Sequence, residues 1–120
     1  MDCIFCKIVN GEIPCYKIYE NDLVLAFLDI SPKSNGHTLI VPKTHYKDID
    51  DIPNDILTNI FDTARIIKKK LEDKLNIDGI ALTQNNGEIQ EVKHFHLHLI
   101  PYYKNSKLSE VEEVYKKIEE

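Results

Sequence analysis

The sequence predicts an α+β fold, with an antiparallel sheet of about five strands, one long helix and short helices near the two ends. Short runs rich in β-branched and aromatic residues, bounded by turn residues, are typical of strands. The stretch 53–75 differs, because its apolar residues recur every three or four positions, as on one face of a helix. Such a helix can bury its apolar face across a sheet.

The first half of the chain contains a short helical turn followed by three strands. The turn is expected over 3–11, CIFCKIVNG. The strands are expected in YKIYEND, LVLAFLDI and HTLIVPK, at 16–22, 23–30 and 37–43, with the loop SPKSNG before the last one. Residues that favour turns or end strands divide these elements: Gly11, Asn21, Asp22, Pro32, Gly36 and Pro42.

The long helix is expected over 53–75. Pro53 suits its first turn, and Asn76 suits its exit. Lysines and acids lie opposite its apolar face, which is formed by Ile56, Ile60, Ala64, Ile67, Leu71 and Leu75.

Two more strands and a terminal helix complete the chain. The strands are expected in GIALTQN, at 79–85, and HFHLHLIP, at 94–101. Ser109 and Glu112 have the spacing of a capping box, which predicts the start of a short helix. Apolar residues follow at helical spacing: Val111, Val114, Tyr115 and Ile118.

Length, charge and composition limit the possible classes. The chain has 120 residues, enough for one domain over 1–120, and 42% of them are hydrophobic. No apolar stretch of roughly 18 residues exists, so we expect no membrane-spanning helix. The net charge is −5 and Arg65 is the only arginine, whereas nucleic-acid binding needs a basic surface. We therefore expect neither a nucleic acid nor a membrane as partner.

Three cysteines bear on the compartment and on metal binding. An odd number, without a secretory signal, argues against a disulfide framework and predicts a reducing, cytoplasmic location. Cys3 and Cys6 form a C-x-x-C pair, which indicates a redox site, half of a metal site, or two small buried apolar residues. Cys15 is expected only to pack in the core.

The segment KHFHLHLIP, at 93–101, alternates histidines with apolar residues. On a strand, His94, His96 and His98 would share one face while the apolar residues pack on the other. Three interpretations fit this row: buried structural histidines, a metal-binding row, or nucleophilic catalysis. In the last, a neutral imidazole attacks phosphorus, and its neighbours bind the charged oxygens and transfer a proton.

The row resembles the signature of the histidine-triad family of nucleotide-binding proteins, His-φ-His-φ-His-φ-φ with φ apolar. Here it reads HFHLHLI, a full match. CIFCKIVNGEIPCYKIYEND looks like the opening of the family, and LAFLDISPKSNGHTLIVPKTHY looks like its central block. NNG and QEV precede the row and IP follows it, so the resemblance covers nearly the whole chain and implies the family's fold.

The resemblance assigns catalytic roles by position. His96, the middle histidine, matches the nucleophile, and His98 matches the residue that holds the phosphate and assists the leaving group. His37 matches a histidine that supports the site, and His94 completes the row. The candidate catalytic residues are therefore His37, His94, His96 and His98.

The resemblance also implies the substrate-binding residues. Asp29 matches a carboxylate that accepts hydrogen bonds from both ribose hydroxyls, which suits its two oxygens. The slot for the base corresponds to Phe5, Ile8, Phe27, Leu28, Ile30 and Leu39. The phosphate-side contacts correspond to Asn85, Gln90 and Val92. Glu91 stands where one branch of the family carries serine, and an ionised carboxylate there can only accept hydrogen bonds.

One branch of the family binds zinc through residues that this chain has. They correspond to Cys3, Cys6, His45 and His94. Two thiolates and two imidazoles make a closed tetrahedral set, which suits one structural zinc per chain.

The resemblance implies a nucleotide-binding hydrolase. It would act at the α-phosphorus of purine nucleoside phosphoramidates or related conjugates, through a covalent nucleotidyl-histidine. Similar family members are homodimers that join their sheets edge to edge. A dinucleoside polyphosphate hydrolase and a zinc-stabilised nucleotide-binding module without turnover are the alternatives.

Overall fold

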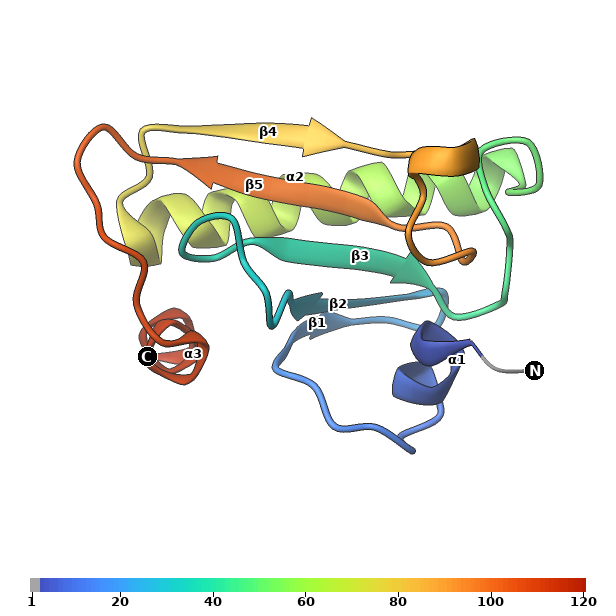
Figure 1. Ribbon diagram of the computed structural model, residues 1–120, viewed down its shortest axis with the longest axis horizontal. Helices are drawn as coiled ribbons and strands as arrows, with labels where there is room; N and C mark the ends of the chain where they lie inside the picture. Colours follow the sequence, from blue (N-terminus) through green and yellow to red (C-terminus); the bar gives the residue numbers. More distant parts are fainter. Residues whose placement is uncertain (1–2) are drawn as a thin grey trace.

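The computed structural model describes residues 3–120 and contains a five-stranded antiparallel sheet in the order β1-β2-β3-β5-β4 (Figure 1). The strands are β1 (Lys17–Glu20), β2 (Val24–Leu28), β3 (Thr38–Pro42), β4 (Gly79–Thr83) and β5 (Leu97–Tyr102). The helices are α1 (Ile4–Val9), α2 (Asn54–Leu75), α3 (Val111–Glu119) and a short 3-10 turn, Gly87–Ile89. The predicted α+β fold is confirmed.

The long helix α2 covers one face of the sheet and lies behind it in Figure 1. Its buried residues belong to one apolar core with residues of β2, β3 and β5. Pro53 was expected in the first turn of the helix, but it is the N-cap residue just before the helix, in an extended conformation with ψ 151°. Asn76 ends the helix in the left-handed conformation, with φ 55°, as predicted. Within 3–120, no helix has the length and apolar character needed to cross a membrane.

A second apolar cluster covers the opposite face of the sheet. There, Phe5 of α1 packs with Phe27 and Leu39, which lie on β2 and β3. Every residue of β2 and β3 is buried, because α2 covers one side of these strands and the α1 segment the other. A strand buried on both faces needs a nearly continuous apolar sequence. The one polar residue of these two strands is Thr38, whose hydroxyl donates to the Gly36 carbonyl oxygen at 2.8 Å.

The last strand begins later than the sequence predicted. A strand was expected over 94–101, but the ladder between β3 and β5 begins where Ile40 pairs with Leu97. The Phe95 N–H instead donates to the Tyr46 carbonyl oxygen at 2.7 Å. The residues before Leu97 are therefore bonded to the loop after β3, and the expected strand start was wrong.

The expected alternation of faces nevertheless holds through this segment. Phe95, Leu97 and Leu99 are buried in the core on the α2 side. His98 pairs with Leu39, and directly opposed residues of a sheet point to the same face, so His98 lies on the α1 side. The apolar residues therefore anchor the segment while the histidines face away from α2.

The predicted capping box of the terminal helix is wrong. Helix α3 begins at Val111, and its N-cap Glu110 makes no side-chain capping bond. The Ser109 N–H donates to Asn35 Oδ1 at 2.8 Å, so the segment before α3 is bonded to the loop before β3. A contact between residues so distant in sequence leaves no local sequence pattern from which it could be predicted.

The turn before β3 depends on Gly36. Its φ is +88°, and a Cβ added there would lie 2.6 Å from Leu75 Cδ1. Only glycine combines this backbone conformation with this close approach to α2. The turn places the next residue, His37, at the start of β3.

Gly36→Ala should lower the free energy of unfolding by about 2–4 kcal/mol, from a strained φ and an overpacked contact. Gly87→Ala is the matched control, because φ is +72° there but an added Cβ would meet nothing within 4 Å. It should cost only about 1–2 kcal/mol. Urea unfolding measures both losses, and equal losses would contradict the close packing at Gly36.

Candidate active site and metal centre

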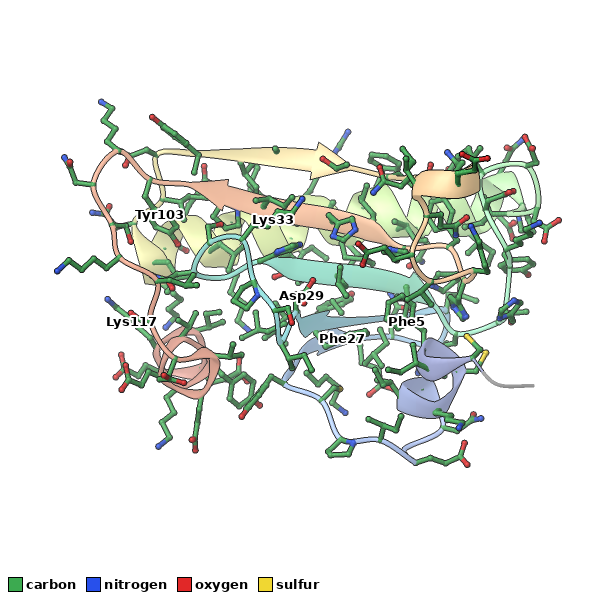
Figure 2. The ribbon with its side chains drawn as sticks, viewed as in Figure 1. Phe5, Phe27, Asp29, Lys33, Tyr103 and Lys117 are labelled. Atoms are coloured by element: carbon green, nitrogen blue, oxygen red, sulfur yellow. The ribbon has the colours of Figure 1, made fainter. Side chains whose placement is uncertain are left out.

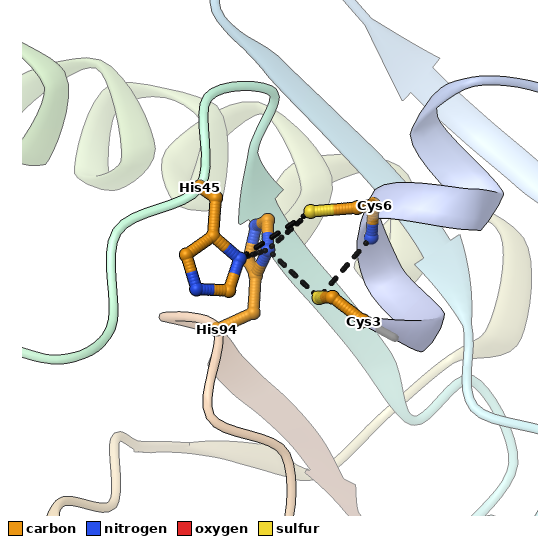
Figure 3. A group of neighbouring side chains, drawn as sticks. All are labelled: Cys3, Cys6, His45 and His94. Carbon is orange, nitrogen blue, oxygen red and sulfur yellow. Dashed lines mark hydrogen bonds between the residues drawn. The ribbon is translucent and has the colours of Figure 1, made fainter. Parts of the chain in front are cut away.

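Two cysteines and two histidines meet where α1 approaches the residues before β5 (Figure 3). Cys3 Sγ lies 3.4 Å from His94 Nδ1, and Cys6 Sγ lies 3.3 Å from His45 Nδ1. The two Nδ1 atoms are 3.1 Å apart, and all four donor atoms lie within 4.8 Å of one another. The structure therefore brings together the four residues predicted as a metal site.

The backbone orients these donors for a metal ion. His94 Nε2 donates to the Pro42 carbonyl oxygen at 2.9 Å, so its Nδ1 carries the lone pair that faces the sulfur atoms. Cys3 Sγ accepts a hydrogen bond from the Cys6 N–H at the start of α1, with a separation of 3.4 Å. In a tetrahedral zinc site, ligand atoms lie roughly 3.3–3.8 Å apart, close to the separations here. The cluster is compatible with zinc.

Burial favours the uncharged forms of these residues when no cation is bound. It lowers the pKa of His94 to about 4. Burial and the neighbouring Cys3 thiol raise the pKa of Cys6 to about 11. A thiol coordinates a metal as the thiolate, so a divalent cation would supply the charge that stabilises it here.

His96 lies next to this cluster with its reactive nitrogen selected by the backbone. Its Nδ1 is 2.8 Å from the His94 carbonyl oxygen, to which it can only donate. Its Nε2 therefore carries the lone pair. The residue is buried, and burial lowers the pKa of its imidazole, so the ring is neutral at pH 7. A neutral imidazole with a free lone pair can act as a nucleophile.

A chain of hydrogen bonds leaves His98 with a proton, rather than a lone pair, on its Nε2 atom. The Lys33 N–H donates to His37 Nδ1 at 3.1 Å, so the proton of this ring is on Nε2. His37 Nε2 then donates to His98 Nδ1 at 2.9 Å, which leaves the proton of His98 on its Nε2. Burial and the neighbouring imidazoles lower the pKa of His98 to about 4. His98 is therefore a neutral hydrogen-bond donor beside the His96 lone pair.

Three of the four candidate catalytic residues, His37, His96 and His98, line a cavity of ≈ 470 Å³, a volume typical of small-molecule sites, whereas His94 does not line it. Phe5 forms part of its apolar wall, with its ring edge-to-face at 5.8 Å from Phe27 and 5.1 Å from His96. In Figure 2, Asp29 lies between Phe27 and Lys33, and all three line this cavity. The cavity therefore joins an apolar part to a part containing imidazoles and charges.

Asp29 is positioned by its own turn. Its Oδ1 accepts the Ser31 N–H at 2.8 Å, and its Oδ2 lies 3.7 Å from His37 Nε2. That separation exceeds a hydrogen bond, and His37 Nε2 already donates to His98. Asp29 Oδ2 is therefore available to accept hydrogen bonds from a ligand.

Most residues predicted to bind substrate do line the cavity: Phe5, Ile8, Phe27, Leu28, Asp29, Ile30, Leu39, Asn85, Glu91 and Val92. Gln90 does not, because its Nε2 donates to the Lys47 carbonyl oxygen at 2.6 Å and its side chain is buried beside that loop. The sequence analysis missed several lining residues: Ile4, Ile13, Pro14, Cys15, Ser31, Lys33 and Ile89. Cys15 was expected only to pack in the core, and it does pack against the second apolar cluster, the one that contains Phe5, Phe27 and Leu39.

The comparisons with known proteins agree with this arrangement. Residues 10–105 match the family model described as HIT domain. An uncharacterized HIT-like protein of Methanocaldococcus jannaschii is 51% identical over 105 residues, which are 84% of this chain and 79% of that protein. The adenosine 5'-monophosphoramidase of Saccharomyces cerevisiae is 48% identical over 101 residues, 82% of this chain and 61% of that enzyme.

A solved structure matches over almost the whole chain. It is a Zn-bound histidine triad family protein from Mycobacterium smegmatis, with a TM-score of 0.90 and 36% sequence identity. The match covers 98% of this chain and 91% of that chain. The likeness in fold therefore extends well beyond the histidine row.

Acid should destabilise the protein partly through His98. In the unfolded chain its pKa is near 6.5, whereas in the native state it is about 4. Between these values the unfolded chain binds a proton that the native state does not, so stability falls as the pH falls from 6.5 towards 4. His98→Asn keeps an oxygen acceptor for His37 Nε2 but removes this titration.

Urea unfolding at pH 7 and pH 5 measures the effect. The loss of unfolding free energy between these pH values should be smaller in His98→Asn than in wild type, by on the order of 1 kcal/mol. Both proteins keep the cysteine and histidine cluster, so acid acts on it equally in both. Equal losses would contradict the neutral, partly buried state of His98.

Proposed function

Because the chain belongs to the HIT domain family, we propose that it is a nucleotide-binding hydrolase that acts on purine nucleoside phosphoramidates at the α-phosphorus. One observation carries this proposal. The lone pair of His96 Nε2 and the proton of His98 Nε2 lie side by side in a cavity of nucleotide size. A phosphorus atom between them would meet a nucleophile and a proton donor at once.

The cavity divides into regions suited to the parts of a nucleotide. Phe5 and Phe27 offer the apolar walls between which a purine would stack. Asp29 Oδ2 would accept hydrogen bonds from the ribose hydroxyls. The phosphate would then reach His96 and His98, which line the same cavity.

In the first step, His96 Nε2 attacks the α-phosphorus. A phosphorus–nitrogen bond forms to His96, and the bond from phosphorus to the substrate nitrogen breaks. His98 Nε2–H donates its proton to the departing nitrogen, so the leaving group is released as an amine. The His98 ring is left with a negative charge, which is balanced by the positive charge of the phosphorylated His96 ring that keeps its proton on Nδ1. His37, bonded to His98 Nδ1 at 2.9 Å, stabilises the orientation of that ring.

In the second step, water attacks the same phosphorus atom. His98 Nε2 now accepts a proton from the water, the bond between phosphorus and His96 breaks, and nucleoside monophosphate is released. The proton on His98 and the lone pair on His96 are both restored. A covalent intermediate divides one difficult displacement at phosphorus into two easier ones.

Glu91 distinguishes this cavity from a purely neutral phosphate site. Its side chain lines the cavity, and its charge raises the pKa of His96 against the larger lowering effect of burial. A carboxylate accepts hydrogen bonds but repels phosphate oxygens. We infer that Glu91 affects the rate and the choice of substrate rather than the binding of the base.

We infer that Cys3, Cys6, His45 and His94 hold one structural zinc ion per chain. Four protein ligands leave no open coordination position, so the metal would stabilise the contact between α1 and the segment before β5. The thiols of Cys3, Cys6 and Cys15 are all free, as suits a reducing compartment such as the cytoplasm.

We further propose that two chains pair through β4, which lies at one edge of the sheet. Exposed apolar side chains lie on β4 and on α2, namely Leu82, Phe61 and Ile66. Pairing along β4 would satisfy its free backbone groups and extend the sheet across a homodimer.

His96→Ala should lower the turnover of adenosine 5'-phosphoramidate by at least about 10³-fold, because no other lone pair replaces His96 Nε2. Turnover is measured by release of ammonia and AMP. Calorimetric titration with AMP is the control for folding, and the variant should bind AMP within about threefold of wild type. Equal hydrolysis by variant and wild type would refute the enzymatic proposal.

Cys3→Ser should remove the zinc, because one of the four donors is lost. Metal analysis of wild type purified without chelators should give about one zinc per chain. Cys15→Ser is the matched control, since that cysteine lies outside the cluster, and it should retain the metal. Metal-free wild type, or full zinc content in Cys3→Ser, would contradict the proposal.

A further inference from the structure

A groove lies beside the catalytic cavity, along the end of β5. Its volume is ≈ 420 Å³, and Lys33 lines both the groove and the cavity. Ile100 and Tyr102 lie two and four residues after His98 on the same strand, so their side chains point to the face that carries His98. The groove is lined by Lys33, Ser34, Asn35, Ile100, Pro101, Tyr102, Tyr103, Ser106, Lys107 and Leu108.

The groove is basic although the chain is acidic. The net charge of the protein is −5, yet Lys33 and Lys107 line the groove and no carboxylate does. Within residues 3–120, neither lysine forms an ion pair, whereas Lys17, Lys43 and Lys68 do. Two ammonium groups without an ion-pair partner in that part of the chain therefore line a groove that adjoins the catalytic cavity at Lys33.

The position of Lys33 matches the direction in which a leaving group departs. Displacement at phosphorus places the attacking and leaving atoms roughly in line, so the leaving group lies on the side remote from His96. Lys33 lies on the side of the proton donor, because its backbone N–H donates to His37 Nδ1 at 3.1 Å and His37 Nε2 donates to His98 Nδ1 at 2.9 Å.

We propose that this groove receives the leaving group and that Lys33, assisted by Lys107, favours amines bearing an anionic substituent such as a carboxylate or a phosphate. The inference rests on the proposed function and specifies its substrate class. The apolar body of such an amine would lie against Ile100, Tyr102 and Leu108, of which Tyr102 and Leu108 are each 60% exposed.

Two conjugates that differ by one carboxylate test this inference. They are the adenosine 5'-phosphoramidates of phenethylamine and of phenylalanine. Lys33→Met keeps the backbone N–H that donates to His37, and a side chain of similar length, but removes the charge. Each enzyme is described by the ratio of its kcat/KM for the anionic phenylalanine conjugate to its kcat/KM for the neutral phenethylamine conjugate. The Lys33→Met substitution should lower this ratio by about five- to tenfold.

The controls separate a local charge effect from a general one. Lys68→Met removes a lysine of α2 that does not line the groove, and it should leave the ratio unchanged. Lys107→Met should lower the ratio less than Lys33→Met, because only Lys33 also lines the catalytic cavity. Raising the salt to about 0.5 M should reduce the ratio of wild type towards that of Lys33→Met, since the charges are exposed.

The outcomes distinguish this inference from the proposed function. An unchanged ratio in Lys33→Met, in Lys107→Met and in the double variant would overturn the inference while leaving the hydrolase proposal intact. If wild type hydrolyses adenosine 5'-phosphoramidate but neither conjugate, the inference alone fails, whereas if it hydrolyses none of the three compounds, the hydrolase proposal fails and the inference fails with it. A ratio that falls in Lys33→Met and not in Lys68→Met supports both.

Discussion

Three hydrogen bonds to the backbone determine which ring nitrogens of the site are free, and the chemistry depends on them. Main-chain oxygens accept from His94 Nε2 and from His96 Nδ1, whereas a main-chain N–H donates to His37 Nδ1. These bonds give neighbouring imidazoles opposite orientations. His94 presents a lone pair to the sulfur atoms and His96 presents one to the cavity, whereas His98, through His37, presents a proton. Three similar side chains thereby present different atoms in different directions, as the three proposed functions require.

The fold makes those bonds possible by burying both faces of its central strands. Phe95, Leu97 and Leu99 fix the histidine segment to the α2-side core, so the histidines must face α1. His94 also connects the two centres, because its side chain belongs to the cysteine and histidine cluster while its carbonyl oxygen orients His96. The proposed metal would therefore stabilise the segment that positions His96, the proposed nucleophile.

Local patterns predicted the fold and the shared face of the histidine row, because both depend on periodicity, whereas the other site residues were predicted from the resemblance to the histidine-triad family. The helical repeat located α2, and strand alternation placed His98 opposite the apolar core. Contacts between distant segments left no such pattern. The bond from Phe95 to Tyr46 delayed the start of β5, and the bond from Ser109 to Asn35 replaced the expected cap of α3. A lysine in a loop likewise gives no local sign that it will face a cavity, so Lys33 was missed.

The central claim is that the nitrogen of His96 left free by the His94 carbonyl attacks phosphorus. Acid-free denaturation of the enzyme during turnover of adenosine 5'-phosphoramidate would trap the intermediate, since phosphorus–nitrogen bonds survive neutral conditions. Peptide mapping by mass spectrometry, with phosphorus NMR to distinguish the two ring positions, then locates the adenylyl group. The account predicts attachment to Nε2 of His96. Attachment to Nδ1, to another residue, or turnover without any adduct would contradict it.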